Sequence, residues 1–326
     1  PIIIAHRGAS GERPEHTLAS YELAIEQGAD FIEPDLVLTK DGVLVARHEN
    51  EISETTDVAD HPEFASRKAT KTIDGKAVSG WFTEDFTLAE LKTLRAKERL
   101  PQLRGTAHDG QYEVPTFAEI LDLLARVNTR RAHPVGVYPE TKHPTYFVSI
   151  GLPHEGPLLA ILDQYGYRGR AAPVFIQSFE VANLKAIRAK SNLPLIQLMD
   201  GEGGPADDAK QSYAAMTTPA GLKAVAAYAD GIGPNKTMII PRGALGTLGD
   251  PTHLVRDAHA AGLKVHPWTF RRENYFLPLD DKGGLNPAGH GDLAAEIDMY
   301  LKTGIDGLFS DNPREAVPAV QAGAKR

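Results

Sequence analysis

Three short segments decide the fold, and they read PIIIAHRGAS (residues 1–10), FIEPDL (residues 31–36) and VLVARH (residues 43–48). Each is an apolar run that carries a histidine, an arginine or an acid at or near its C-terminal end. Polar residues gathered at the C-terminal ends of strands are typical of active sites in parallel α/β sheets and barrels. The segments therefore predict buried strands with a functional site where they end.

The middle segment places two acids two residues apart. In a strand, residues i and i+2 point to the same face, so Glu33 and Asp35 project together. Taken alone, such a pair is more often a strand end that leads into a turn, with both acids in water. If the two acids are buried, their repulsion requires a cation, an arginine or both between them.

The composition is that of an ordinary globular chain. Its 326 residues are 42% hydrophobic and 24% charged, with a net charge of −8. This length allows a large core in one or two domains. The negative charge argues against a nucleic-acid partner, and no apolar run is long enough for stable membrane insertion. Cysteine is absent, which excludes disulfides and thiolate ligands. The sequence starts at Pro1 without a methionine, so either a signal segment was removed or the chain was trimmed. We expect the first, with a periplasmic or secreted location.

Strand and helix patterns alternate along most of the chain. Strands are expected to start at eight residues, which are Ile2, Phe31, Pro134, Val174, Leu193, Gly231, Lys264 and Ile305. Eight alternating strands and helices predict the α/β class and a (β/α)8 TIM barrel. A doubly wound sheet is the alternative, but it would carry G-x-G-x-x-G after the first strand. This chain has only the G-x-x-G of Gly8 and Gly11 there.

Local signals fix two further features of the first fifty residues. Helical spacing and the following Gly28 predict the first helix over residues 14–27. Asp41-Gly42 is a tight-turn signal, so residues 43–48 should pair antiparallel with residues 37–39.

The segment 49–112 interrupts the alternation. It is polar, and its only clear helix spans residues 87–94, where Thr87 and Glu90 form a capping box. A long segment with so little periodicity is usually functional or a small subdomain. We therefore predict one barrel domain over residues 1–326, with an insertion at 49–112 that lies over the C-terminal mouth of the barrel.

In a barrel, the C-terminal ends of all strands meet at one mouth. The residues expected there are two histidines, two basic residues, three carboxylates, a glutamine and a tryptophan. They are His6, His48, Arg7, Lys142, Glu33, Asp35, Glu140, Gln177 and Trp268. Three carboxylates make an all-oxygen site suited to Ca²⁺ or Mg²⁺. Arginine and lysine bind phosphate, while two histidines can donate and accept protons. Together these residues predict metal-assisted cleavage of a phosphate ester.

These motifs together resemble the glycerophosphodiester phosphodiesterase family, and most of all its periplasmic type. The resemblance covers essentially the whole barrel and extends to the position of the insertion. It rests on His6-Arg7-Gly8, Glu33-Pro34-Asp35, Asp41-Gly42 with His48 after five residues, Glu140-Thr141-Lys142, Gln177-Ser178-Phe179 and residues 307–311 (GLFSD). The likeness to the periplasmic type rests on Pro14-Glu15-His16-Thr17 and the long segment 49–112. One departure is Glu49, where the family usually has aspartate.

The resemblance implies a role for each residue of the site. The metal ligands would be Glu33, Asp35 and Glu140. His6 and His48 would be the general acid and base, in an order that the sequence leaves open. The substrate and its phosphate would be bound by Arg7, Lys142, Gln177 and Trp268. A glycerol hydroxyl would attack phosphorus, and water would open the resulting cyclic phosphate.

Some of these residues also fit purely structural roles. Trp268 and Gln177 could belong to the core, and Asp311 is expected to cap the helix that begins at Pro313. The remaining histidines show no zinc-site spacing and are expected to be core or surface residues. They are His16, His61, His108, His133, His143, His154, His253, His259, His266 and His290.

The expected activity is hydrolysis of a glycerophosphodiester, such as glycerophosphocholine, to sn-glycerol 3-phosphate and an alcohol. One alternative is a lysophospholipase D-type enzyme on lipid-derived substrates, against which the polar insertion argues. Another is a catalytically silent binding protein on the same barrel, against which the presence of both histidines and all three carboxylates argues. The sequence leaves open the choice between Ca²⁺ and Mg²⁺, the preferred alcohol and the oligomeric state.

Overall fold

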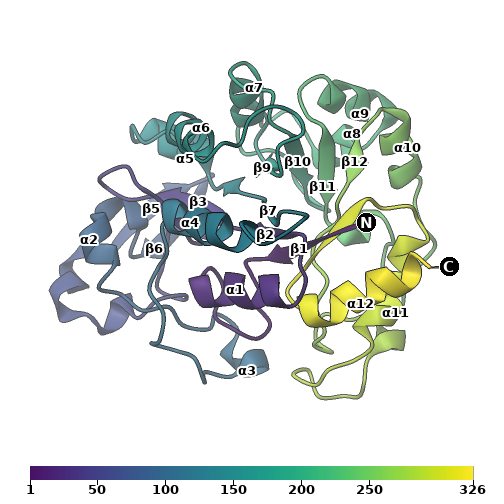
Figure 1. Ribbon diagram of the computed structural model, residues 1–326, viewed down its shortest axis with the longest axis horizontal. Helices are drawn as coiled ribbons and strands as arrows, with labels where there is room; N and C mark the ends of the chain where they lie inside the picture. Colours follow the sequence, from purple (N-terminus) through teal and green to yellow (C-terminus); the bar gives the residue numbers. More distant parts are fainter. Residues whose placement is uncertain (326) are drawn as a thin grey trace.

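The computed structural model describes residues 1–325 and confirms the predicted (β/α)8 barrel, with parallel strands inside and most helices outside (Figure 1). The strands pair in the orders β13-β1-β2-β7 and β12-β11-β10-β9-β8-β3. Their bounds are β1 (Ile2–His6), β2 (Phe31–Glu33), β3 (Asp35–Leu38), β7 (Gly136–Val137), β8 (Glu140–Thr141), β9 (Ile176–Ser178), β10 (Leu195–Met199), β11 (Gly231–Pro234), β12 (Lys264–Val265) and β13 (Gly307–Ser310).

Ten strand segments make eight barrel strands. β2 and β3 are one strand interrupted at Pro34, and β7 and β8 are one strand interrupted at residues 138–139. A proline lies in each gap, and proline has no N–H to donate to the strand ladder. The ring closes between the last two strands, where Asp306 N donates to Val265 O (3.0 Å) and Phe270 N donates to Phe309 O (2.8 Å).

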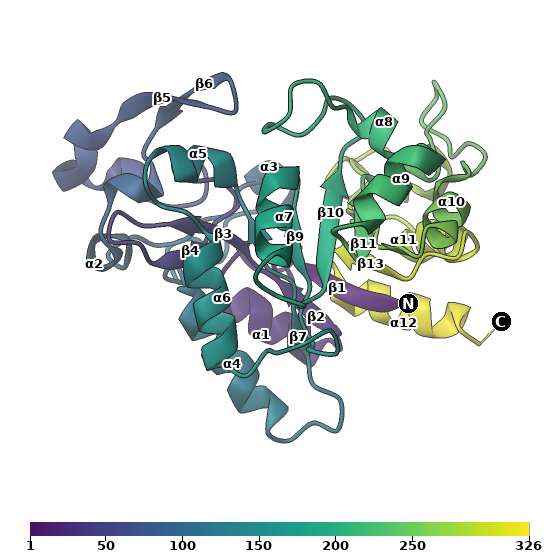
Figure 2. The ribbon, with the colours of Figure 1, turned by 90° about the horizontal axis from the view of Figure 1, so that it is seen from above.

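Most of the helices cover the outside of the ring, and two short ones belong to the insertion. Their bounds are α1 (Leu18–Glu26), α2 (Leu88–Leu91), α3 (Pro101–Arg104), α4 (Phe117–Asn128), α5 (Pro144–Ser149), α6 (Glu155–Gln164), α7 (Val181–Arg188), α8 (Tyr213–Met216), α9 (Pro219–Ala226), α10 (Leu254–Ala260), α11 (Leu293–Leu301) and α12 (Pro313–Gly323). The first strand β1 and the last helix α12 lie side by side (Figures 1 and 2).

The first helix is shorter than predicted. It begins at Leu18 instead of residue 14, because Thr17 acts as its N-cap and accepts a hydrogen bond from Ser20 N (3.1 Å). The preceding residue, His16, has a left-handed φ of 55°. The four residues that were assigned to the helix therefore form a loop, and this loop turns two polar side chains toward the barrel mouth.

The predicted hairpin after the second barrel strand is present. β4 (Leu44–Ala46) pairs antiparallel with β3, and Val45 lies opposite Val37. The helix predicted at 87–94 is also present as α2, with the capping box of Thr87 and Glu90, but it ends at Leu91.

The sequence did not reveal a second hairpin within the insertion. β5 (Ala69–Ile73) and β6 (Lys76–Gly80) pair antiparallel around the turn at Asp74-Gly75. Their residues are Lys- and Thr-rich and largely exposed, so they show no apolar alternation. Figure 2 shows this hairpin on the same side of the barrel as the loop between β10 and α8.

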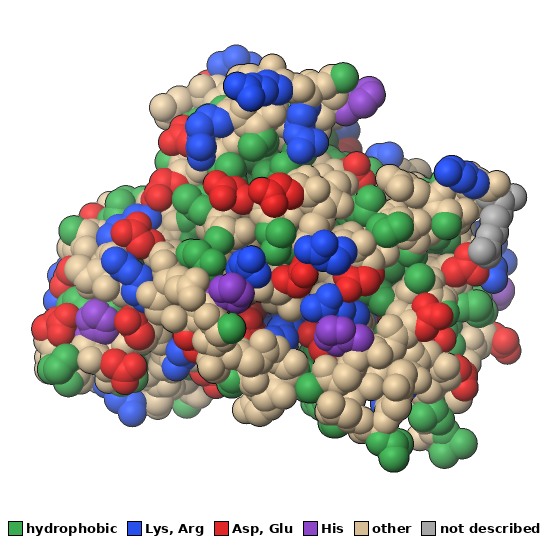
Figure 3. Space-filling view, turned by 60° about the horizontal axis from the view of Figure 1, so that its bottom comes forward, with side chains coloured by type: hydrophobic (Ala, Val, Ile, Leu, Met, Phe, Trp, Pro, Cys, Tyr) green, Lys and Arg blue, Asp and Glu red, His purple; other side chains and the backbone are tan. Residues whose placement is uncertain are grey.

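The surface carries charges of both signs. On the face shown in Figure 3, acidic and basic side chains are interspersed and form no large patch of one sign. Within residues 1–325, no helix combines the length and the hydropathy that a membrane-spanning segment requires.

One glycine in the barrel offers a test of strand packing. A Cβ on Gly136 would lie 2.2 Å from the Phe31 ring and 2.6 Å from the backbone oxygen of Pro173. We expect Gly136→Ala to lower the free energy of unfolding by about 1–3 kcal/mol in urea denaturation, because the backbone has to shift. Gly156→Ala in α6 is the control, since a Cβ there meets nothing within 4 Å. Equal midpoints for the two variants would contradict this account.

Candidate active site

The strand register brings the predicted site residues into line. His6 lies opposite Glu33 between β1 and β2, and Asp35 lies opposite Glu140 between β3 and β8. Glu140 in turn lies opposite Gln177 on β9. Residues that are paired in register on adjacent parallel strands are neighbours in space, so segments more than a hundred residues apart meet at one place.

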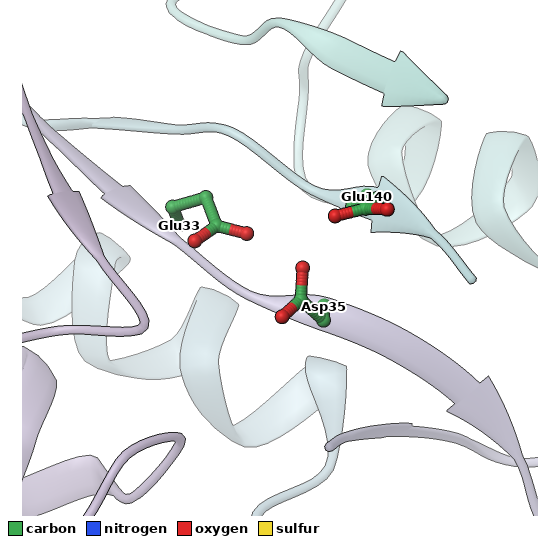
Figure 4. Close-up of side chains that lie close together, drawn as sticks. All are labelled: Glu33, Asp35 and Glu140. Atoms are coloured by element: carbon green, nitrogen blue, oxygen red, sulfur yellow. The ribbon is translucent and has the colours of Figure 1, made fainter. Parts of the chain in front are cut away.

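Three carboxylates form the centre of this place. Glu33, Asp35 and Glu140 each offer an oxygen within 4.8 Å of the others, and Figure 4 shows their side chains pointing toward one another. All three are buried. Burial and the negative charge of Asp35 raise the pKa values of Glu33 and Glu140 well above the usual range.

This arrangement fits a hard divalent cation. Asp35 Oδ1 is buried and has no hydrogen-bond partner among residues 1–325. Unpaired buried carboxylates are costly, and an all-oxygen donor set suits Ca²⁺ or Mg²⁺. Ca²⁺ and Mg²⁺ both take oxygen ligands and differ in the number of ligands and retained waters. Three carboxylates alone therefore suit either ion.

A second layer of residues holds Asp35 and Arg7. His16 Nε2 lies 2.8 Å from Asp35 Oδ2, and His16 Nδ1 lies 2.6 Å from the hydroxyl of Tyr21. Burial opposes ionisation of Asp35, but His16 and Arg7 outweigh it and hold its pKa well below the usual range. Arg7 also donates through Nη1 to Glu15 Oε2 (3.0 Å).

Sequence reasoning assigned no site role to His16 or Glu15, although both belong to a motif of the resemblance, and it treated His16 as an ordinary core or surface histidine. Their positions depend on the left-handed backbone of the loop before α1. The signal that could have found them is the motif of residues 14–17 (PEHT) itself.

Asp311 orients His6, which corrects the sequence-based prediction that Asp311 caps the last helix. Asn312 occupies the N-cap position of α12. The Asp311 carboxylate instead lies 2.6 Å from His6 Nδ1 and accepts from Arg104 Nη2 (2.8 Å) and Arg271 Nε (2.7 Å). An ionised acceptor at Nδ1 assigns the proton to that nitrogen, so His6 Nε2 presents its lone pair.

His6 is neutral near pH 7. Burial, and then the positive charge of Arg7, lower the pKa of His6 to about 4, although Asp311 acts in the opposite direction. Its Nε2 lies 4.0 Å from Glu33 Oε2, beside the carboxylate centre.

His48 lies beside Lys142, which in turn contacts Glu140, and it is more accessible than His6. Its side chain is 29% exposed. Lys142 Nζ lies 3.5 Å from His48 Nε2 and 3.8 Å from Glu140 Oε1. Partial burial, and then the charges of Arg7 and Lys142, hold the pKa of His48 well below its usual value.

A cavity of about 260 Å³ opens onto these groups. Of the nine predicted site residues, all except Asp35 and Lys142 line it. Gln177 donates to Glu33 Oε1 (3.3 Å), and Trp268 donates through Nε1 to Gly233 O (2.9 Å). The sequence-based analysis assigned no site role to four further lining residues, which are Phe179, Leu198, Asp200 and Phe309.

The C-terminal ends of the barrel strands carry buried carboxylates, two histidines and the basic side chains Arg7 and Lys142. This combination defines a class of enzyme, a hydrolase of phosphate esters.

Known proteins narrow this class. Residues 6–315 match the glycerophosphoryl diester phosphodiesterase family. The chain is 40% identical to glycerophosphodiester phosphodiesterase GDPD6 of Arabidopsis thaliana, over 95% of this chain and 83% of that protein. It is 30% identical to the glycerophosphodiester phosphodiesterase of Haemophilus influenzae, over 97% of this chain and 88% of that protein. The protein therefore belongs to the glycerophosphodiester phosphodiesterase family and is an enzyme of that activity.

Solved structures match the fold over nearly the full chain. A glycerophosphoryl diester phosphodiesterase from Silicibacter pomeroyi has a TM-score of 0.69 at 23% identity, covering 99% of this chain and 94% of that one. A phosphodiesterase from Oleispira antarctica, solved in complex with the product sn-glycerol-3-phosphate, has a TM-score of 0.63 at 22% identity, covering 98% and 97% of the two chains.

Proposed function

We propose that this protein hydrolyses glycerophosphodiesters, such as glycerophosphocholine, to sn-glycerol 3-phosphate and an alcohol, with a divalent cation held by Glu33, Asp35 and Glu140. The observation that carries the proposal is the meeting of this carboxylate centre with His6, His48 and Arg7 around one cavity. The product named for the Oleispira antarctica relative supports it.

The cation, Ca²⁺ or Mg²⁺, would polarise the phosphate and favour ionisation of the attacking hydroxyl. Arg7 and Lys142 hold the phosphate by charge in this scheme. Gln177 fixes the orientation of Glu33, and Trp268 forms part of the apolar wall beside the substrate.

Two histidines move the protons. His6 takes the proton from a glycerol hydroxyl as it attacks phosphorus, because Asp311 leaves His6 Nε2 free to accept. The negative phosphate of the bound substrate offsets the charges of Arg7 and Lys142 that lower the pKa of His48, so His48 carries a proton in the complex. It gives this proton to the leaving alcohol as the bond between phosphorus and the alcohol oxygen breaks. The product of this half is a cyclic glycerol phosphate. In the second half, water opens the ring while the two histidines exchange roles.

The segment 49–112 is an insertion that serves the site in two ways in this proposal. Arg104 of α3 is buried against Asp311, and residues of the β5–β6 hairpin line a larger cavity beside the catalytic one. We therefore assign the insertion to shaping the C-terminal mouth of a single barrel domain.

The proposal is tested with purified protein and glycerophosphocholine, with and without EDTA, by measuring sn-glycerol 3-phosphate. We expect product only when free divalent cation is present. If neither Ca²⁺ nor Mg²⁺ gives product, the proposed activity is refuted. If EDTA leaves product formation undiminished, the requirement for a divalent cation is refuted. A deoxy substrate that lacks the neighbouring hydroxyl should not react, and its normal turnover would refute the cyclic intermediate.

Asp311 is expected to act through His6. Asp311→Asn should lower kcat about 10- to 100-fold with little change in KM, because an amide neither selects the His6 tautomer nor stabilises its protonated form. The variant also leaves Arg104 and Arg271 without their carboxylate partner, so rates are compared below the unfolding midpoint of each protein. A change in KM alone, or no change in kcat, would contradict this role.

A further inference from the structure

A second, larger cavity adjoins the catalytic one. Its volume is about 820 Å³, and it lies between the β5–β6 hairpin and the loops that follow β8, β9 and β10. Glu140, Phe179 and Asp200 line both cavities, so the two are continuous. A phosphodiester held at the carboxylate centre has room for its alcohol group in this direction.

The walls of the larger cavity are strongly acidic. They carry eight carboxylates against two lysines and one histidine. Two of the three basic groups are already paired, since Lys142 contacts Glu49 (3.7 Å) and His143 contacts Glu49 (2.6 Å) and Asp74 (2.5 Å). The cavity therefore keeps a surplus of negative charge.

Glu180 is a buried carboxylate in this wall. Its residue is 3% exposed, yet its carboxylate has no ion-pair partner among residues 1–325 and accepts a hydrogen bond from Thr145 N (3.2 Å). Burial, with Asp74 and Asp207 nearby, raises the pKa of Glu180 to about 7. A buried carboxylate without a counter-charge is costly and gains from a positively charged ligand.

Aromatic rings stand beside these acids. The Phe179 ring packs edge-on against Tyr213, with centroids 6.2 Å apart, and against Trp268, with centroids 6.0 Å apart. Phe179 and Tyr213 line the larger cavity, together with Glu180 and Asp200. Aromatic rings and carboxylates around one space are the combination that binds quaternary ammonium groups.

We propose that the larger cavity binds the alcohol part of the substrate and selects alcohols that carry a positively charged amine, of the choline or ethanolamine type. Glu180 and Asp200 supply the attraction, and Phe179 and Tyr213 the aromatic contact. This inference rests on the proposed function, because it assigns the leaving group of the same reaction.

The test compares two esters of the same shape. One is glycerophosphocholine, and the other carries 3,3-dimethylbutanol, in which a carbon atom replaces the quaternary nitrogen. At low ionic strength we expect kcat/KM to favour the choline ester about 10- to 100-fold. Glu180→Gln and Asp200→Asn should each reduce that ratio several-fold, while Glu22→Gln on the exposed face of α1 should keep it. A ratio near one in the unaltered protein, or a ratio that neither cavity variant changes, would overturn the proposal.

Binding separates this inference from the catalytic one. Calorimetry with choline and with 3,3-dimethylbutanol needs no turnover, and choline should bind at least five-fold more tightly to the unaltered protein than to the Glu180→Gln variant. Selective choline binding in a protein that cleaves neither ester would refute the proposed function alone. Equal binding of choline and the neutral alcohol would refute the cationic subsite, even in an active enzyme.

Discussion

His6→Ala and His48→Ala should each slow the hydrolysis of glycerophosphocholine about 10²- to 10⁴-fold, the usual effect of losing a general acid or base. Both side chains line the catalytic cavity, with His6 beside Glu33 and His48 beside Lys142. Each alanine removes a proton carrier from both halves of the reaction. The rate of sn-glycerol 3-phosphate formation under saturating substrate measures the loss.

A change of leaving group distinguishes the two histidines. p-Nitrophenol leaves without protonation, so the p-nitrophenyl ester of glycerol phosphate does not need the acid in its first step. With this ester, release of p-nitrophenol by His48→Ala should stay within about tenfold of the unaltered protein, while His6→Ala keeps its large loss. The reverse pattern would exchange the two assignments.

A surface histidine provides the matched control for these variants. His253 is exposed at the start of α10, and His253→Ala should retain the full rate with both substrates. Near-normal rates for His6→Ala or His48→Ala would remove that residue from the mechanism.

Local sequence patterns were enough to predict the barrel and the carboxylate centre, because each residue of that centre lies at the end of an apolar run. Glu33, Asp35 and Glu140 are each at the end or the beginning of a strand segment, and barrel geometry then forces them together. Once the alternation of strands and helices is recognised, no long-range information is required to expect this convergence.

The roles of residues that act through distant partners could not be predicted from the sequence. Asp311 looks like a helix cap because Asn312-Pro313 follows it. Its partners lie far away in the sequence, with His6 305 residues and Arg104 207 residues before it. His16 reaches Asp35 only because the preceding loop adopts a left-handed turn. Neither contact has a local signature, since both depend on how a loop folds back over the barrel mouth.

The acidic cavity illustrates the same limit. Glu180 and Asp200 follow β9 and β10 as single acids in unremarkable sequence. They become part of a cavity only because the β5–β6 hairpin forms its opposite wall. The sequence analysis did not predict the strands of that hairpin. Charge on one side of a cavity becomes a binding preference only when the other side leaves it uncompensated.

Glu140→Gln should have opposite effects on activity and on the stability of the cation-free protein. Glu140 joins two other buried carboxylates, and their repulsion destabilises the fold when no cation is present. In EDTA the variant should therefore be more stable than the unaltered protein by about 1–2 kcal/mol, the scale of one pKa unit for a buried charge. Thermal unfolding in EDTA measures this difference, with Glu22→Gln as the control.

The same substitution removes one of three anionic cation ligands, so kcat should fall about 10²- to 10⁴-fold, which corresponds to several kcal/mol of lost charge stabilisation. Ca²⁺ or Mg²⁺ should raise the unfolding temperature of the unaltered protein and have a much smaller effect on Glu140→Gln. We expect the variant to gain stability in EDTA and to lose both activity and the response to cations. These results together would show that the carboxylate centre serves to bind the ion and does not stabilise the fold. An unaltered protein that shows the same unfolding temperature in EDTA and in either cation would contradict that conclusion.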